Sequence, residues 1–165
     1  MYTLIGGMKS RAMRVAWLLE ELGVEWTLNA VPPHADEVRT HYPAGKVPVL
    51  IEGDRVLTDS SAIMTYLADK HQACTLPAGT FERGEQDAHF HFVLDEIDAV
   101  LWTAAKHSFV LPEKLRVPEV KPTVRKEFER AQPRLLDRIG DGPYLMGTTF
   151  TIADILAAHC IGWAV

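Results

Sequence analysis

The first stretch of this sequence that could do chemistry runs from Gly6 to Ala12 and contains Ser10. A helix is predicted to begin there, because apolar residues recur at helical spacing from Ala12 to Leu22. The first turn of a helix presents unpaired N–H groups and the positive end of the helix dipole, which together hold an anion well, a thiolate included. Ser10 is therefore either the cap of this helix or the contact of a bound anion, and its residue type fits both interpretations.

Two later stretches have the same dual character. Pro48 follows Val47 at the start of an apolar run that ends at Ile51, where a proline can open a strand and is a candidate for a cis bond. Asp59 and Ser60 precede another helical pattern, so Ser60 is a candidate cap and Asp59 adds a negative charge beside the positive helix end. Taken singly, each feature has a purely structural explanation.

Metal and disulfide chemistry receive little support from the sequence. The two cysteines, Cys74 and Cys160, lie far apart and form no CxxC pair, while His89 and His91 would point to different faces of a helix. We therefore expect no metal centre and no disulfide framework. The absence of a cysteine near Ser10 also disfavours thiol–disulfide exchange by a protein thiolate.

The composition is that of an ordinary globular protein. Of its 165 residues, 47% are hydrophobic and 24% are charged, with a formal net charge of -5. The negative charge argues against broad nucleic-acid binding, and no apolar run reaches the roughly 18 residues that a membrane-spanning helix needs. The amino terminus lacks the basic segment and apolar run of a signal peptide, so we expect a cytoplasmic protein that binds neither nucleic acid nor membrane.

The elements predicted for the first half follow the order β-α-β, a short helix, and then β-β-α. The predicted strands are Tyr2–Ile5, Trp26–Val31, residues 48–51 and Arg55–Thr58, and the predicted helices are Ser10–Leu22, Asp36–His41 and one that starts at residues 59–61. A strand, a helix and a strand in about thirty residues form a βαβ unit with parallel strands.

The second half is predicted to contain helices only, after a linker punctuated by Pro and Gly. A long helical pattern covers residues 81–109, and a more charged one covers residues 124–139. A further helix is predicted after Phe150, where Thr151 can cap the first turn while Asp154 reaches back to it in a capping box.

Together these features resemble the soluble glutathione S-transferases, and bacterial members in particular. Four sequence features carry the resemblance, in this order: the helix start at Ser10, the helical segment Arg14–Glu21, the segment Lys46–Leu50 and the run Asp59–Ile63. It implies an α/β thioredoxin-like N-terminal domain (βαβ-α-ββα) over residues 1–76, followed by an all-α C-terminal domain over residues 80–165 that is incomplete at its end.

The resemblance implies that Ser10 is the catalytic residue, which stabilises the thiolate of bound glutathione. A free thiol has a pKa of about 8.5, and lowering it by about 2 units requires about 2.7 kcal/mol of preferential stabilisation of the thiolate. The loop 6–9 lacks the tyrosine or cysteine of some transferase classes. The thiol contact is therefore either Ser10 or a backbone N–H within residues 9–11.

The glutathione-binding residues implied by the resemblance are Ser10, His34, Lys46, Val47, Pro48, Asp59 and Ser60. Val47 would pair its backbone with the cysteinyl part of the tripeptide, as an added strand does, and Pro48 would turn that backbone outward. Asp59 would hold the γ-glutamyl amine, and Ser60, at a helix start, would hold the γ-glutamyl carboxylate.

At the other end of the tripeptide, His34 and Lys46 would meet the glycyl carboxylate. The implied reaction joins glutathione, as co-substrate, to a small electrophile in a homodimeric enzyme without a metal. Two alternatives stay open: a glutathione-dependent peroxidase or disulfide reductase that acts on a peroxide or disulfide substrate, and a transferase-like binding module without catalysis.

Overall fold

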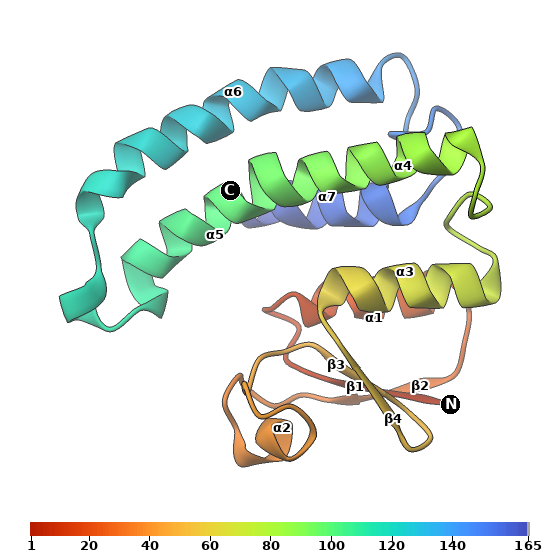
Figure 1. Ribbon diagram of the computed structural model, residues 1–165, viewed down its shortest axis with the longest axis horizontal. Helices are drawn as coiled ribbons and strands as arrows, with labels where there is room; N and C mark the ends of the chain where they lie inside the picture. The colour runs from red at the N-terminus through yellow and green to blue at the C-terminus, as the bar shows by residue number, and fades with distance from the viewer. Residues whose placement is uncertain (165) are drawn as a thin grey trace. The chain divides into compact units, whose positions relative to one another are not determined.

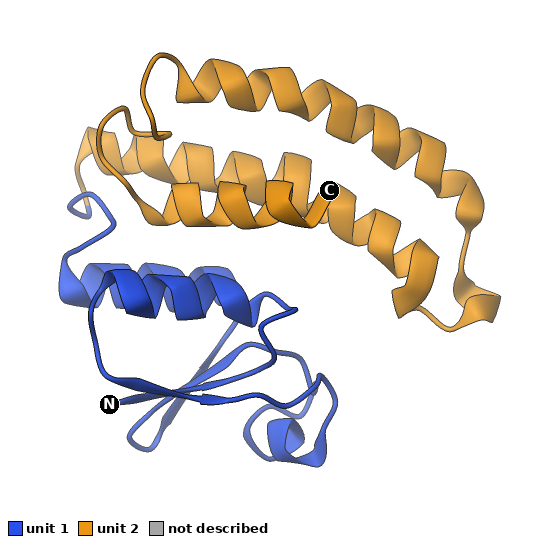
Figure 2. Ribbon diagram, turned by 180° about the vertical axis from the view of Figure 1, so that it is seen from behind, with its two compact units in different colours: residues 1–78 blue, residues 79–165 orange. Residues whose placement is uncertain are grey.

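A computed structural model describes residues 1–164, and the chain divides into two units between Ala78 and Gly79 (Figure 1). The N-terminal unit combines a sheet with helices, and the C-terminal unit is built from helices (Figure 2). The predicted boundaries, 1–76 and 80–165, lie on either side of this division. The element order confirms the predicted fold class, a βαβ-α-ββα unit followed by a helical unit.

Four short strands form a mixed sheet in the order β2-β1-β3-β4. They are β1 (Tyr2–Ile5), β2 (Trp26–Asn29), β3 (Val49–Glu52) and β4 (Arg55–Thr58). Ile5 pairs with Asn29 of the parallel strand β2 and with Val49 of the antiparallel strand β3, while Val49 also pairs with Thr58 of β4. The ends of β1, β2 and β4 and the start of β3 therefore share one end of the sheet, which we name the Ile5 end. The opposite end is the Tyr2 end.

Helices cover both faces of this sheet. They are α1 (Ala12–Glu21), α2 (Asp36–His41) and α3 (Ser60–His71). The helices α1 and α3 pack side by side over one face (Figure 1). Successive side chains of a strand point to opposite faces of a sheet. Ile5 and Val49 point to the face opposite α1 and α3, where they form a core with Val38 of α2.

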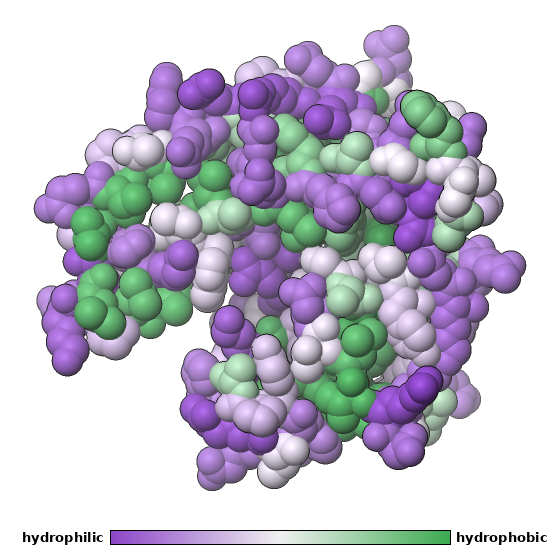
Figure 3. Space-filling model, viewed as in Figure 1, coloured by the Kyte–Doolittle hydropathy of each residue, from purple (hydrophilic) through white to green (hydrophobic). Residues whose placement is uncertain are grey.

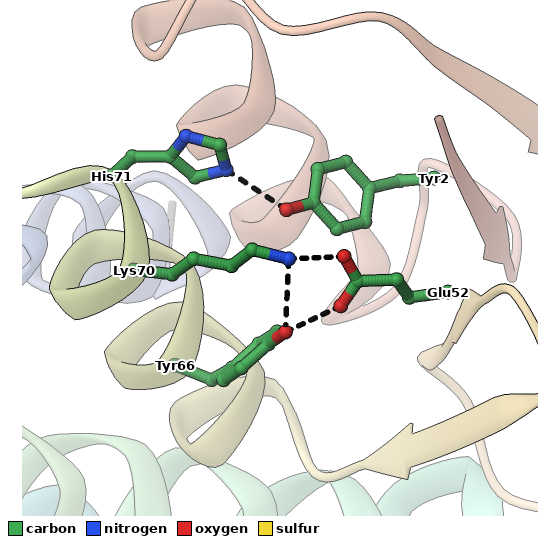
Figure 4. Close-up of polar contacts among 5 residues, drawn as sticks. All are labelled: Tyr2, Glu52, Tyr66, Lys70 and His71. Atoms are coloured by element: carbon green, nitrogen blue, oxygen red, sulfur yellow. Dashed lines mark hydrogen bonds and ion pairs between the residues drawn. The ribbon is translucent and has the colours of Figure 1, made fainter.

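A network of five side chains fixes the C-terminal end of α3 to the Tyr2 end of the sheet (Figure 4). Tyr66 and Lys70 both donate to the carboxylate of Glu52, and Lys70 Nζ also donates to Tyr66 Oη at 3.2 Å. Tyr2 Oη lies 2.8 Å from His71 Nε2. We call these residues the Tyr2 network; every member has its polar group paired with another.

The C-terminal unit begins with one long helical run, as predicted for residues 81–109. It comprises α4 (Phe81–Phe92), the π-helical segment η1 (Val93–Asp98), α5 (Ala99–Ala105) and a second π-helical segment, η2 (Lys106–Val110). Two single 3₁₀ turns, η3 (Glu113–Leu115) and η4 (Pro118–Val120), follow. The segment η1 keeps apolar residues buried at Val93 and Ile97, which is why periodicity predicted one uninterrupted helix there, whereas η2 has no buried residue.

The charged helix α6 (Lys121–Ile139) begins three residues earlier than predicted. Pro122 lies in its first turn, where a missing N–H does not break the helix. Its buried residues are Val124, Ala131 and Leu135. On the face seen in Figure 3, hydrophilic side chains cover α6 along the upper edge. No helix within residues 1–164 has the length and apolar character that crossing a membrane requires.

The last helix is α7 (Ile152–Ala164). As predicted, the side chain of Asp154 in its first turn accepts a hydrogen bond from the residue before the helix: Oδ2 of Asp154 accepts the N–H of Thr151 at 2.8 Å. Oδ1 of Asp154 accepts the N–H of Leu145 at 2.7 Å. One carboxylate therefore joins the helix start to the loop before it. The role of this motif is structural, because both of its oxygens are occupied by backbone groups of the same unit.

Candidate functional site

The sheet topology brings all seven predicted site residues to one place. Each lies in a segment that leaves or enters a strand at the Ile5 end. These segments are the β1–α1 loop with Ser10, the stretch after β2 with His34, the run Lys46–Pro48 before β3, and the pair Asp59–Ser60 after β4. Since the four segments are far apart in the sequence, strand pairing rather than local structure assembles them.

Gly6 allows two of these segments to touch. Its φ is +140°, and a Cβ atom at this position would lie 2.9 Å from Ala12 Cβ and 3.0 Å from Val47 Cβ. Its N–H donates to the carbonyl of Asn29 at 2.9 Å. The β1–α1 loop therefore runs directly against Val47, at a separation that only glycine permits. The Gly-Gly pair before the helix was visible in the sequence, but its partner Val47 was not.

Ser10 lies half-buried immediately before α1, which begins at Ala12 rather than at Ser10 as predicted. The Ser10 hydroxyl accepts the N–H of Ala12 at 3.1 Å and donates to the carbonyl of Gly7 at 2.7 Å. It thus pairs one N–H of the first turn, as a cap does. To donate to a bound sulfur instead, the hydroxyl has to rotate away from Gly7.

The Val47–Pro48 peptide bond is cis, as the sequence suggested. Val47 is half-buried and belongs to no strand. Within residues 1–164, neither its N–H nor its C=O takes part in a hydrogen bond. Because native proteins pair nearly all of their buried backbone polar groups, two unpaired groups beside the β1–α1 loop can accept an extended peptide in the way that a sheet accepts an additional strand.

The cap of α3 is Asp59, and the prediction that Ser60 serves as the cap is wrong. Asp59 Oδ1 accepts the N–H groups of Ser61 and Ala62 at 2.9 and 3.1 Å. A carboxylate one residue before the helix reaches both first-turn donors, whereas Ser60 is already the first helical residue. Asp59 also has a φ of +73°, a conformation that costs a non-glycine residue about 1–3 kcal/mol and often occurs at ligand sites.

Polar groups of this pair remain for a ligand. Asp59 is exposed, and its Oδ2 has no hydrogen-bond donor among residues 1–164. Ser60 is 3% exposed, and its N–H has no acceptor within the same part of the chain. The first turn of a twelve-residue helix thus offers an N–H and a partial positive charge beside a free carboxylate oxygen.

His34 and Lys46 are brought together through Gly45. His34 has a φ of +68°, and its N–H donates to the carbonyl of Gly45 at 2.7 Å. A Cβ atom on Gly45 would lie 2.6 Å from His34 Nδ1, so no larger residue fits. Lys46 follows directly and is exposed. Tyr42 packs against the core around Val38, and its carbonyl accepts the N–H of Gly45 at 2.8 Å.

The cysteines do not add a nucleophile to this site. Burial raises the pKa of the Cys74 thiol, and the negative charge of Glu21 raises it further. Cys160 is buried in the C-terminal unit. Since a thiol with a raised pKa is less ionised at neutral pH, Cys74 is not favoured as a reactive thiolate, and Cys160 lies outside the N-terminal unit that carries the site. Within the part of the chain that the structure describes, no group of three or more metal-ligating side chains occurs.

Comparison with known proteins gives a consistent result over both units. A family model described as the N-terminal domain of glutathione S-transferase matches residues 4–75. A glutathione S-transferase of Triticum aestivum is 30% identical, over 96% of this chain and 75% of its own length. Glutathione S-transferase GstA of Escherichia coli O157:H7 is 28% identical, over 88% of this chain and 74% of its own length.

Solved structures agree with the sequence relatives. A glutathione transferase from Methylococcus capsulatus superposes with a TM-score of 0.85 at 25% identity, covering 99% of this chain and 82% of the other. A theta class enzyme from Xanthomonas axonopodis pv. citri, solved with glutathione bound, gives 0.81 at 26% identity with the same coverage. The chain spans 61% of a putative alpha-2 transferase of Dictyostelium discoideum and 48% of the human theta-2B enzyme.

Proposed function

Because the chain belongs to the soluble glutathione S-transferase family, we propose that it binds glutathione at the Ile5 end of the sheet and activates its thiol for attack on a small electrophile. The observation that carries this proposal is the unpaired backbone of Val47 against Gly6 of the loop that carries Ser10, with the start of α3 at the same end of the sheet. An extended tripeptide with a carboxylate at each end matches such a set of groups.

Each part of glutathione has a partner in this arrangement. The N–H and C=O of Val47 pair with the cysteinyl residue, and Pro48 turns them outward. Asp59 Oδ2 accepts the γ-glutamyl ammonium, while the N–H of Ser60 donates to the γ-glutamyl carboxylate. This division of roles uses the carboxylate oxygen and the N–H that capping leaves unoccupied.

The glycyl carboxylate lies at the opposite end of the tripeptide, where His34 and Lys46 are the basic residues. The contact between His34 and Gly45 places both of them beside the run that leads to Val47. Lys46 is exposed and has no ion-pair partner within residues 1–164, so its charge is available to an anion.

Ser10 supplies the catalytic hydrogen bond. Its O–H rotates from the Gly7 carbonyl to the cysteinyl sulfur, so that the thiol loses its proton to water more readily. The sulfur then forms a C–S bond to the electrophile with its electron pair, and the leaving group departs with the pair of the bond that breaks. A charged hydrogen bond contributes about 1.5–3 kcal/mol, which is of the size needed to lower the thiol pKa by 1–2 units.

The test is the rate of glutathione conjugation to an aryl halide, with binding measured separately by calorimetry. We expect Ser10→Ala to lower kcat by about tenfold to a hundredfold while the Kd for glutathione changes by less than about threefold. Ser10→Thr, which keeps the hydroxyl, should retain most of the rate. Equal rates in the parent and in Ser10→Ala would remove Ser10 from catalysis and favour a backbone N–H within residues 9–11.

Two other activities remain as outcomes of the same experiments. Turnover of a hydroperoxide or a mixed disulfide, with no conjugation, would indicate the peroxidase or reductase function. Saturable binding of glutathione without any turnover would indicate a binding module. Disulfide exchange through a protein thiolate ranks behind conjugation, because neither Cys74 nor Cys160 lies in the four segments of this site.

We also propose that the protein forms a homodimer in the cytoplasm. A groove in the C-terminal unit is lined by the carboxylates Asp95 and Glu96 of η1 and by Glu127, Arg130 and Arg134 of α6, and Arg134 forms an ion pair with Glu96. The groove thus carries charges of both signs, and two-fold pairing would set Asp95 of one copy against Arg130 of its partner. Light scattering should give twice the chain mass of 18.4 kDa, and Arg130→Glu should shift the equilibrium towards the monomer.

A further inference from the structure

Arg39, to which the sequence pattern assigned no role, makes three contacts that connect the two ends of the segment from His34 to Pro43. It lies in the last turn of α2 (Figure 1). Its Nε donates to the carbonyl of His34 at 3.2 Å, and its Nη1 donates to the carbonyl of Pro43 at 3.4 Å. Its Nη2 lies 3.4 Å from His34 Nδ1. One guanidinium therefore spans the two ends of the segment and touches the imidazole.

The backbone of His34 needs such support. Its positive φ of +68° is unfavourable for a residue with a side chain. The hydrogen bond from its N–H to Gly45 holds one side of the residue, and Arg39 holds its carbonyl on the other. Val38, the neighbour of Arg39, is fully buried in the core with Ile5, so the helix that carries the guanidinium is itself fixed.

The contact between the two side chains determines which imidazole nitrogen carries the proton. A guanidinium has five N–H donors and no acceptor, so Nη2 of Arg39 can bond to His34 Nδ1 only when Nδ1 is the unprotonated nitrogen. The proton of the neutral ring is then on Nε2. His34 is thereby prepared as a donor through Nε2–H, which is the form that hydrogen-bonds a carboxylate.

The charge of Arg39 is also unneutralised. No carboxylate lies within ion-pair distance of its guanidinium among residues 1–164, although α2 contains Asp36 and Glu37. Its three contacts use three of five N–H groups. A positive charge that is held by carbonyls rather than by an acid keeps its full attraction for an anion near His34.

We infer that Arg39 is a positioning residue for the glycyl end of glutathione, acting through the backbone and the tautomer of His34, and that it sets the preference for a tripeptide over γ-glutamylcysteine. This rests on the proposed function, in which His34 meets the glycyl carboxylate. Because γ-glutamylcysteine lacks the glycyl residue but keeps the γ-glutamyl and cysteinyl parts, it isolates this end of the ligand.

The experiment measures the Kd of glutathione and of γ-glutamylcysteine by calorimetry for the parent, Arg39→Ala, His34→Ala and the double variant. Arg39→Ala should weaken glutathione binding by about fivefold to twentyfold and γ-glutamylcysteine binding by less than twofold. His34→Ala should have a similar effect, and the double variant should lose little more than either single variant, because the two residues act as one unit. Arg55→Ala, which removes an exposed arginine from β4, is the matched control and should change neither affinity.

A spectroscopic measurement tests the same inference without a ligand. Long-range proton–nitrogen correlation should show the Nε2–H tautomer of His34 in the parent and a mixture of tautomers in Arg39→Ala. Arg39→Lys should behave as Arg39→Ala does, since the single ammonium of lysine cannot bridge His34 and Pro43 as the separate N–H groups of a planar guanidinium do.

The outcomes separate this inference from the proposed function. If Arg39→Ala weakens both peptides equally, or if its effect adds fully to that of His34→Ala, the positioning role is overturned while the proposed function stands. If Arg39→Lys restores glutathione affinity, the role is overturned in favour of simple charge attraction. If the parent binds neither peptide, the proposed function fails, and the inference fails with it.

Discussion

The two ends of the sheet in the N-terminal unit are built on opposite principles. At the Tyr2 end, five polar side chains pair with one another, and no member of the network is left without a partner (Figure 4). At the Ile5 end, the backbone of Val47, the N–H of Ser60 and Oδ2 of Asp59 have no partner within residues 1–164. Both ends are rich in polar groups, so composition does not distinguish them.

Positive φ angles occur at both ends, and what distinguishes the Ile5 end is that they lie beside unpaired polar groups. Two residues with side chains and positive φ, His34 and Asp59, lie at the Ile5 end, together with Gly6 at +140°. At the Tyr2 end, Gly53 in the turn between β3 and β4 has a φ of +59°, and Gln72, which ends α3, has a φ of +51° with its N–H paired to the helix. Unfavourable conformations beside unpaired polar groups are the mark of a binding site, whereas a closed set of hydrogen bonds contributes to folding only.

The largest effect is expected where the Ile5 end is most crowded. Gly6→Ala should lower the free energy of unfolding by about 3 kcal/mol, because the new Cβ would meet Ala12 and Val47 in a backbone conformation that favours glycine. Urea denaturation measures this change. Gly7→Ala is the matched control, since nothing lies within 4 Å of a Cβ there, and it should change stability by less than about 0.5 kcal/mol.

Equal losses in the two glycine variants would contradict the close approach of the β1–α1 loop to Val47. A large loss in Gly6→Ala that leaves glutathione affinity unchanged at a temperature where the variant is folded would separate the packing of the loop from ligand binding. The comparison between the two ends of the sheet would then lose its functional meaning.

A smaller and more selective effect is expected at the start of α3. Asp59→Asn keeps an oxygen for the N–H groups of Ser61 and Ala62, so stability should change by less than about 0.5 kcal/mol. The loss of the negative charge should raise the Kd for glutathione by about tenfold, because the γ-glutamyl ammonium loses a charged acceptor. Asp54→Asn, in the hairpin turn at the Tyr2 end, should leave the Kd unchanged.

Calorimetry and thermal unfolding check these two quantities on the same samples. If Asp59→Asn and Asp54→Asn had the same Kd, Asp59 would have a capping role only. The Ile5 end would then resemble the Tyr2 end, with its polar groups serving the fold.

The smallest effect concerns the Tyr2 network and its dependence on pH. Hydrogen bonds from Lys70 and then from Tyr66 lower the pKa of Glu52 below its usual 4.5. As the pH falls, the unfolded chain therefore takes up this proton first, so the stabilisation is present above pH 4.5 and is lost as the pH falls through the lowered pKa. The pair is exposed and screened, so Glu52→Gln should lower Tm by no more than about 3 °C near neutral pH.

Thermal unfolding from pH 3 to pH 7 measures this difference. The parent and Glu52→Gln should converge at the acid end, since protonated Glu52 resembles glutamine. The affinity for glutathione should be the same in both at neutral pH. A lower affinity in Glu52→Gln would show that the two ends of the sheet are coupled and would contradict the division drawn between them.

Local patterns predicted an element well where a single helix or strand periodicity holds along its whole length. The strands Tyr2–Ile5 and Arg55–Thr58 and the helix Asp36–His41 lie where alternation and spacing placed them. The cis bond before Pro48 and the reach-back of Asp154 were also anticipated, because each depends on residues adjacent in sequence. The roles of the seven predicted site residues stay predictions.

Predictions of helix starts failed where two neighbouring residues can both pair the N–H groups of the first turn. Ser60 and Asp59 are both good caps, and the carboxylate reaches the first-turn N–H groups from one residue earlier. The helix α1 begins two residues after Ser10, whose hydroxyl bonds both to the turn before it and to the helix after it. The π-helical segment η1 keeps the apolar stripe through Val93 and Ile97, so periodicity does not reveal it.

The sequence by itself determined the order of the elements and the family resemblance, and it supplied the residues that we propose hold a tripeptide. The tertiary structure alone decided that Gly6 touches Val47, that Gly45 lies against His34 and that Arg39 spans the segment between them. The reason is physical: the apolar period of a helix or strand shows which of its faces is buried, but it does not show which distant segment packs against that face. A close approach between distant segments depends on strand register and on the space that one missing Cβ leaves.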